Sequence, residues 1–161
     1  TTGPRASLGG IMSVKYMRET LSGVYPEISA LGLFQMDEVH HLKDIAPAGF
    51  DQDMYKKLES IGFVRVFTVR DDDKLVGYLI IIIGPDLHCK GQRIASEDGF
   101  FVVKDYRKLG LGKELIKMAE NALKAEGLRR LHLSTTSINP IDSMLKKCGY
   151  SKIETKYEKV L

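Results

Sequence analysis

The chain has 161 residues, of which 43% are hydrophobic and 28% charged, a composition that suits one globular domain with a buried core. Its formal net charge is only +3 and it contains no long basic block, so charge gives no argument for a nucleic-acid-binding protein. Cys89 and Cys148 are too few for a disulfide framework and lack zinc-site spacing, which predicts a reducing, cytoplasmic setting and no metal.

Residues 1–10 lack the apolar segment of a signal peptide, and we expect a flexible tail or a remnant of the expression vector there. A single domain is predicted over residues 11–161. The apolar run at residues 79–83 is far shorter than the ~20 residues that a membrane helix requires, so it is predicted as a core strand and no membrane partner is expected.

The residue patterns in the first half of the domain predict one strand, two helices and a hairpin. Residues 11–18 alternate apolar and polar side chains, which is typical of a strand. Residues 19–36 have helical character interrupted by a glycine and a proline, and residues 53–60 form a second helical stretch. Residues 63–70 and 75–83 predict paired strands around the polar turn DDDK.

The second half continues the alternation of strands and helices. A strand is predicted over residues 94–103, an amphipathic helix over 111–127, a strand over 128–135, a short helix over 140–148 and a last strand over 150–161. The order β-α-α-β-β-β-α-β-α-β indicates an α/β fold, a mixed sheet with helices on both faces.

The junction before the amphipathic helix carries RKLGLGK at residues 107–113. The first N–H groups of a helix lack intrahelical partners and the helix dipole adds positive potential, so an anion is stabilised there. Gly110 and Gly112 lack a Cβ and would let a diphosphate approach the main chain. Charge-assisted hydrogen bonds would come from Arg107, Lys108 and Lys113. The alternative is a basic, glycine-containing turn that merely leads into a helix.

Two better-known phosphate loops do not fit this segment. A Walker A loop needs Ser or Thr after the Gly-Lys pair, whereas Glu114 follows Lys113. The dinucleotide fingerprint needs a glycine where Leu115 stands. The pattern that remains is R-x-x-G-x-G.

With this motif and this order of elements, the chain resembles the GNAT superfamily of acyl-CoA N-acyltransferases. DYRKLGLG (residues 105–112) matches its R/Q-x-x-G-x-G/A motif, and MLKKCGY (residues 144–150) is similar to its later LYxxxGF. The resemblance covers nearly everything from residue 11 onward. It implies a mostly antiparallel central sheet with helices on both faces and strands splayed at the acyl-CoA site. VRVFTVRDDDKLVGY and KDYRKLGLG also resemble acetyltransferases of phages and prophages.

The resemblance implies acetyl-CoA as co-substrate. Its pyrophosphate would lie on the glycine loop, and its pantetheine arm would pair with the preceding strand, whose edge would stay unpaired until the cofactor supplies partners. Asn139 matches an asparagine that often touches the arm, although an Asn-Pro turn explains it equally well. The implied cofactor-binding residues are Phe100, Phe101, Val102, Arg107, Lys108, Leu109, Gly110, Leu111, Gly112, Lys113 and Asn139.

The implied reaction is direct attack of a primary amine on the thioester, with a backbone N–H near Val102 as oxyanion donor. An alkylamine has a pKa of about 10.4, so a base or an ordered water must take its proton. Asp98 is the first candidate and Glu97 the second, the alternative being two solvated strand-edge carboxylates. Many family members have a tyrosine in the LYxxxGF motif that donates a proton to the departing thiolate. Leu145 stands at that position here, so the thiolate is expected to take its proton from solvent.

The acceptor is expected to be a small-molecule or protein amine held by residues 21–60 and 84–92. His40 and His41 follow two acidic residues and could bind a cationic acceptor, but a solvated helix face is the alternative. A homodimer through the late apolar strands is an option. The rival functions are a non-catalytic acyl-CoA-binding domain and, less favoured, a nucleic-acid-binding domain.

Overall fold

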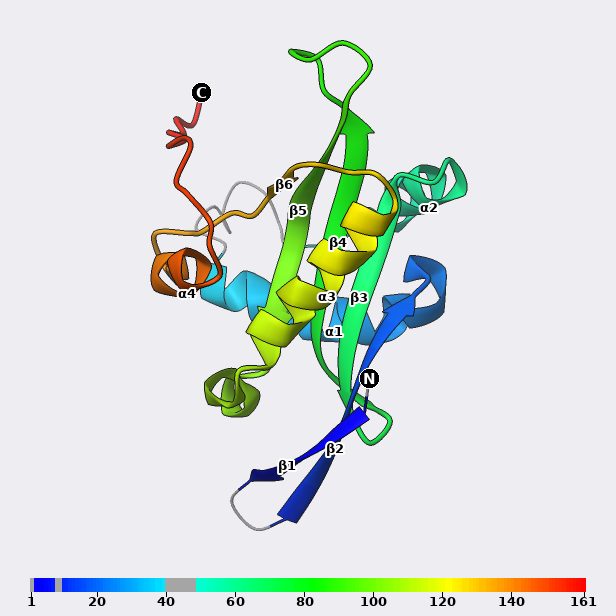
Figure 1. Ribbon diagram of the computed structural model, residues 1–161, viewed down its shortest axis with the longest axis vertical. Helices are drawn as coiled ribbons and strands as arrows, with labels where there is room; N and C mark the ends of the chain where they lie inside the picture. Colours follow the sequence, from blue (N-terminus) through cyan, green and yellow to red (C-terminus); the bar gives the residue numbers. More distant parts are fainter. Residues whose placement is uncertain (1, 8–9, 40–48) are drawn as a thin grey trace.

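The computed structural model describes residues 2–7, 10–39 and 49–161. Its six strands form one sheet in chain order, and every neighbouring pair is antiparallel except β5 with β6 (Figure 1). The strands are β1 (Thr2–Ser7), β2 (Gly10–Glu19), β3 (Val64–Asp71), β4 (Lys74–Pro85), β5 (Arg93–Val102) and β6 (Leu131–His132). The helices are α1 (Leu21–Val39), α2 (Gln52–Ser60), the 3₁₀ helix η1 (Lys104–Leu109), α3 (Leu111–Ala125) and α4 (Asp142–Lys147).

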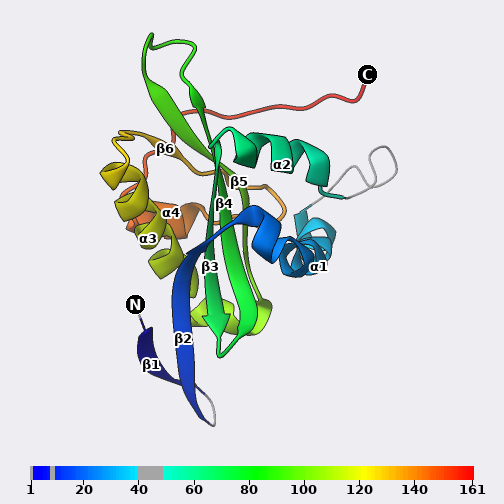
Figure 2. The same ribbon diagram turned by 90° about the vertical axis from the view of Figure 1, so that its right-hand side faces the viewer.

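Helices cover both faces of the sheet, as predicted (Figure 2). On one face, Leu79 and Ile81 pack in a cluster with the buried stripe of α3. On the other, Tyr78 and Ile80 pack with the buried side of α1. Successive side chains of a strand point to opposite faces, so β4 needs apolar residues at every position. This is the physical reason for its continuous apolar run.

The two ends of the chain differ from the sequence prediction. Where a flexible tail is expected, Thr2–Ser7 forms β1 and pairs with Gly10–Lys15 of β2 in an extension that projects from the sheet. This pairing gives backbone partners to an otherwise open strand edge. The strand predicted over residues 150–161 is absent. Residues 151–161 are exposed and carry no helix or strand, because their alternating side chains have no apolar face to cover.

The other departures are smaller. The predicted strand at residues 128–135 shrinks to Leu131–His132. Helix α1 continues through Pro26 instead of breaking there. Its N-terminus is fixed from outside, because the carboxylate of Glu59 on α2 accepts the backbone N–H of Ser22 at 3.1 Å. This cap and the buried side of α1 outweigh the hydrogen bond that a proline forfeits.

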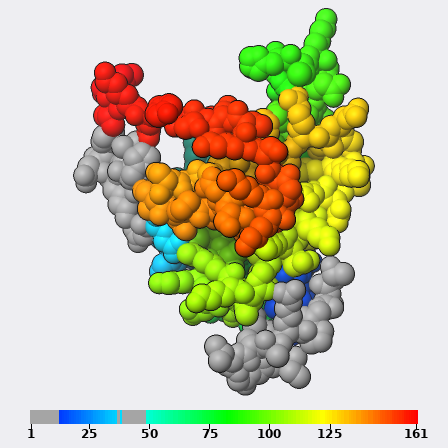
Figure 3. Space-filling view, turned by 60° about the vertical axis from the view of Figure 1, so that its left-hand side comes forward, coloured from blue at the N-terminus to red at the C-terminus, as the bar shows by residue number. Residues whose placement is uncertain are grey.

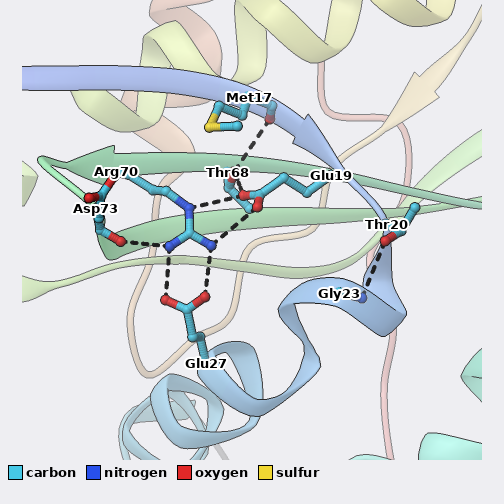
Figure 4. Close-up of polar contacts among 8 residues, drawn as sticks. All are labelled: Met17, Glu19, Thr20, Gly23, Glu27, Thr68, Arg70 and Asp73. Carbon is cyan, nitrogen blue, oxygen red and sulfur yellow. Dashed lines mark hydrogen bonds and ion pairs between the residues drawn. The ribbon is translucent and has the colours of Figure 1, made fainter.

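Arg70, at the end of β3, connects the sheet to α1 (Figure 4). Its guanidinium donates to Glu19 Oε2 at 3.2 Å, to Glu27 Oε1 at 2.8 Å and to the carbonyl oxygen of Asp73 at 2.8 Å. The hydroxyl of Thr68 also donates to Glu19. Only 12% of the Arg70 side chain is exposed, so its partners could not be replaced readily by water.

We predict that Arg70→Met destabilises the fold by about 1–3 kcal/mol, because it leaves the half-buried carboxylate of Glu19 without its cation. Chemical denaturation of both proteins at pH 7 measures this difference. Arg18→Met is the matched control, since the side chain of Arg18 is 47% exposed and its pair with Glu126 contributes less. Equal losses in the two variants would contradict a special role for Arg70.

The stability difference between wild type and Arg70→Met should also depend on pH. The hydrogen bond from Arg70 holds the pKa of Glu27 below its usual value of 4.5. A lowered folded-state pKa contributes stability above the unfolded pKa and loses it as pH falls through the folded pKa. The difference is therefore expected to be largest near neutral pH and to shrink in acid below pH 4.5.

Candidate functional site

Strand β5 loses its neighbour halfway along its length. β6 pairs with it only at Ala95 and Ser96, and β5 then continues alone on that side to Val102. The N–H of Val103 donates to the carbonyl oxygen of Val76 in β4. Because successive residues of a strand direct their polar groups to opposite edges, the backbone groups of Val102 face the open edge. The predicted splaying of the sheet is confirmed.

The open edge is not bare, which corrects one expectation. The carbonyl oxygen of Phe100 accepts a hydrogen bond from Gln35 Nε2 at 3.2 Å, and that of Val102 accepts from Arg107 Nε at 2.8 Å. The prediction that these edge groups stay unpaired until a cofactor supplies partners is therefore wrong for two carbonyls. A half-buried carbonyl without a partner is costly, and side chains fill the role that a neighbouring strand would have.

The last turns of α1 supply the side chains at this edge. Gln35 Oε1 also accepts from the hydroxyl of Tyr78 at 2.5 Å. Glu38 lies one turn further and its Oε2 accepts from Arg107 Nη2 at 2.7 Å and from Asn139 Nδ2 at 3.4 Å. Residues three apart share a helix face, which is why both glutamine and glutamate reach the same edge. Glu38 thus brings together Arg107 and Asn139, two residues that the sequence predicts as cofactor-binding.

The glycine loop has the predicted position between β5 and α3. Gly110 has φ +77° and ψ 10°, a left-handed conformation that favours glycine, and no side chain caps the helix after it. The first intrahelical bond runs from the N–H of Glu114 to the carbonyl oxygen of Gly110 at 3.3 Å. The N–H groups of Leu111, Gly112 and Lys113 precede that bond and form the helix N-terminus.

Tight packing, and not the backbone angle, favours glycine at position 112. A Cβ at this position would lie 3.0 Å from Cζ of Phe100 and 3.8 Å from Sδ of Met144 in α4. The first turn of α3 therefore lies directly against β5 and α4. Figure 3 shows the yellow-green loop and the orange segment with α4 side by side on one face. Lys108 and Lys113 are exposed beside the loop.

Arg107 lies along the strand and is also partly exposed to solvent. Besides its bonds to Val102 and Glu38, its guanidinium lies 5.4 Å from the ring centroid of Phe101. Only 33% of its side chain is exposed. In this arrangement Arg107 is committed to β5 and α1, and its predicted contact with a phosphate requires an exchange of partners.

The two predicted catalytic carboxylates diverge at a β-bulge. Glu97 is opposite Ile81 and Gly99 is opposite Ile80, so Asp98 is the extra residue in β5. The exposed carboxylate of Asp98 accepts a hydrogen bond from the hydroxyl of Tyr55 on α2. Glu97 Oε2 instead accepts the backbone N–H of Ser134, beyond the end of β6, at 3.2 Å.

Burial raises the pKa of Glu97 above its usual value, and the nearby charge of Asp98 acts in the same direction. The hydrogen bonds from Ser134 oppose this shift without cancelling it. Burial, followed by the hydrogen bond to Asp98, also raises the pKa of Tyr55. Tyr55 therefore remains a phenol at neutral pH and acts as a donor.

Neither Tyr150 nor Tyr157, the tyrosines near the predicted motif in the sequence, is placed as the proton donor that the resemblance implies. Leu145 is 8% exposed and packs in the core from α4. The hydroxyl of Tyr150 donates to Glu120 on α3 at 2.7 Å, and Tyr157 is 94% exposed in the C-terminal segment. The backbone of His132 pairs with Ser96 in the sheet.

The remaining predictions concern two histidines, metal-binding groups and membrane helices. His40 and His41 lie outside the described residues. Within the described ranges, no group of three or more His, Cys, Asp and Glu side chains could hold a metal ion. None of the helices in those ranges is long and apolar enough to cross a membrane.

The sequence patterns did not identify three residues that shape the site. These are Gln35 and Glu38, which lie at the open edge of β5, and Tyr55, which binds Asp98. Their partners lie 65, 69 and 43 residues away along the chain. No local pattern signals contacts of this kind.

Comparison with known proteins agrees with this geometry. The family model described as "Acetyltransferase (GNAT) family" matches residues 35–150, which is more than half of the chain. Comparison with curated protein sequences gives no significant match.

Solved structures share the fold over nearly their whole length. An aminoglycoside N-acetyltransferase in complex with CoA has TM-score 0.70 at 14% identity, covering 96% of this chain and 99% of that one. Ribosomal-protein-alanine N-acetyltransferase from Brucella melitensis biovar Abortus 2308 has TM-score 0.67 at 19% identity, covering 92% and 99%. Glucosamine-6-phosphate N-acetyltransferase from Arabidopsis thaliana has TM-score 0.69 at 15% identity, covering 92% and 98%.

These three neighbours have names that specify three different acceptors, so the shared fold does not select one. The family match, the splayed sheet and the glycine loop before α3 all agree. The chain belongs to the acetyltransferase (GNAT) family and is an acyltransferase.

Proposed function

We propose that the protein transfers the acetyl group of acetyl-CoA to a primary amine by direct attack of the amine on the thioester. The observation that carries this proposal is the open edge of β5, which ends at an uncapped helix N-terminus with exposed lysines on either side. An extended arm can pair with such an edge while a diphosphate lies on the helix terminus.

The residues at this edge fit coenzyme A by their chemistry. The N–H groups of Leu111, Gly112 and Lys113 suit the pyrophosphate, and the ammonium groups of Lys108 and Lys113 add charge. Phe100 and Val102 offer the main-chain groups for the arm, which also follows the aromatic ring of Phe101. Acetyl-CoA, when bound, would supply the acetyl group as an activated thioester.

The carboxylate that deprotonates the amine is Asp98 in this proposal. It is exposed on the bulge and lies beside α2, which together with α1 borders the acceptor side. Glu97 is the second carboxylate, and its raised pKa places its titration closer to neutral pH. With Leu145 in the core, the departing thiolate takes its proton from solvent.

The function is tested by mass spectrometry of the purified protein for retained coenzyme A, followed by coenzyme A release assays with a panel of primary amines. Amine-dependent release supports the proposal. Binding without release by any amine favours the non-catalytic acyl-CoA-binding alternative. Failure to bind acetyl-CoA contradicts both.

Gly110→Ala is expected to weaken coenzyme A binding about tenfold, because a Cβ disfavours the left-handed conformation at φ +77° that begins α3. Isothermal titration calorimetry measures the affinity. Gly127→Ala is the matched control: Gly127 has φ +82° just after the other end of α3, so the variant carries similar strain away from the loop. Equal affinities in the two variants would argue against the glycine loop as the pyrophosphate site.

Glu38→Ala is expected to tighten coenzyme A binding about threefold, because it frees Arg107 and Asn139 from their shared carboxylate. Titration calorimetry at low and high salt gives the comparison. Asp53→Ala removes one exposed acidic charge from α2 and controls for the change in net charge. Weaker binding by Glu38→Ala would mean that Glu38 supports the cofactor site and does not compete for it.

Asp98→Asn is expected to lower kcat/KM about 100-fold for the best amine of the panel, since the base is lost. Glu97→Gln is expected to keep most activity, because in this proposal Glu97 does not take the proton of the amine. The pH dependence of kcat/KM measures both. The opposite ranking of the two variants would assign the base to Glu97.

A further inference from the structure

Tyr55 lies opposite the bulge of β5. Its hydroxyl donates to the carboxylate of Asp98, although the two residues are 43 positions apart in the chain. Asp98 is exposed, so without this bond its carboxylate would be free to change rotamer. A donor on one carboxylate oxygen fixes the side chain and leaves the other oxygen available to accept a proton.

The aromatic ring of Tyr55 is itself held by packing between α1 and α2. It lies 5.9 Å from the ring centroid of Phe50, at an interplanar angle of 54°. The backbone of Phe50 is fixed in turn, because its carbonyl oxygen accepts from the hydroxyl of Tyr25 at 3.2 Å. A Cβ at Gly32 would overlap the Phe50 ring, so this glycine lets α1 approach closely. The Tyr55 hydroxyl therefore has a position set by the fold.

The ionisable groups around the pair leave Tyr55 in the donor role. Burial and the Asp98 carboxylate both raise the pKa of the phenol, and smaller effects come from Tyr78 on β4 and Tyr25 on α1. Glu97, next to Asp98 in β5, interacts electrostatically with the Asp98 carboxylate. Tyr55 cannot replace Asp98 as a base, because an ionised phenol beside a carboxylate is disfavoured.

We infer that Tyr55 is a positioning residue, which orients the Asp98 carboxylate toward the attacking amine through the hydrogen bond across the bulge. The inference rests on the proposed role of Asp98 as the base.

The test is Tyr55→Phe, which removes the hydroxyl and keeps the ring against Phe50. Carbon-13 NMR of aspartate-labelled protein at neutral pH, with the Asp98 carboxyl signal assigned by its loss in Asp98→Asn, is expected to show a changed chemical shift for Asp98 in Tyr55→Phe. With acetyl-CoA and the best amine of the panel, kcat should fall about tenfold. The KM for acetyl-CoA should stay unchanged, because the proposed acetyl-CoA contacts do not include Tyr55.

Tyr150→Phe is the matched control, because it removes a tyrosine–carboxylate bond of the same kind from Glu120 on α3. It should leave the Asp98 chemical shift and kcat unchanged. If Asp98→Asn is inactive but Tyr55→Phe keeps the wild-type rate and Asp98 chemical shift, the positioning role is wrong and the base assignment stands. If Asp98→Asn keeps the wild-type rate, the base assignment itself is wrong, and the inference falls with it.

Discussion

The early loss of β6 as a neighbour of β5 is the constraint on which the rest of the site depends. A strand inside a sheet needs partners on both edges, and β5 has a second one only at Ala95 and Ser96. From there to Val102, side chains from α1 and from the glycine loop satisfy the exposed carbonyls. The fold thereby maintains a strand edge whose carbonyls have side-chain partners, and in the proposed function an extended ligand exchanges these hydrogen bonds for its own.

The sequence could predict the parts of the site that are local in the chain. Gly110 at a left-handed turn and the apolar spacing of α3 both lie within a few residues of each other, so the loop and its helix were recognisable. The element order followed from the hydrophobic patterning, and the splayed sheet followed from the resemblance. The strand predicted over residues 150–161 is not formed. Alternation of side chains along a segment indicates a strand only if the fold also offers a surface for its apolar face to pack against.

The contacts that shape the site could not be predicted, because they join residues far apart in the chain. Gln35, Glu38 and Tyr55 each form a hydrogen bond with a residue on a distant segment of the chain. The residues around each of them on its helix form no motif that indicates this contact. The bulge is a similar case. One extra residue at Asp98 sends two adjacent carboxylates to partners on different elements, and only the register of β4 against β5 reveals it.

Helix α1 contributes to both sides of the site, with Tyr25 in the packing that holds Tyr55 and with Gln35 and Glu38 at the edge of β5. A ligand that pairs with the edge must release hydrogen bonds to α1, and a ligand that packs against α1 and α2 bears on the same helix. Two such ligands are thermodynamically linked, so whatever factor one changes in the affinity of the other applies reciprocally. In the proposed function, where the cofactor lies on the edge of β5 and the acceptor beside α1 and α2, the two affinities are expected to depend on each other through α1.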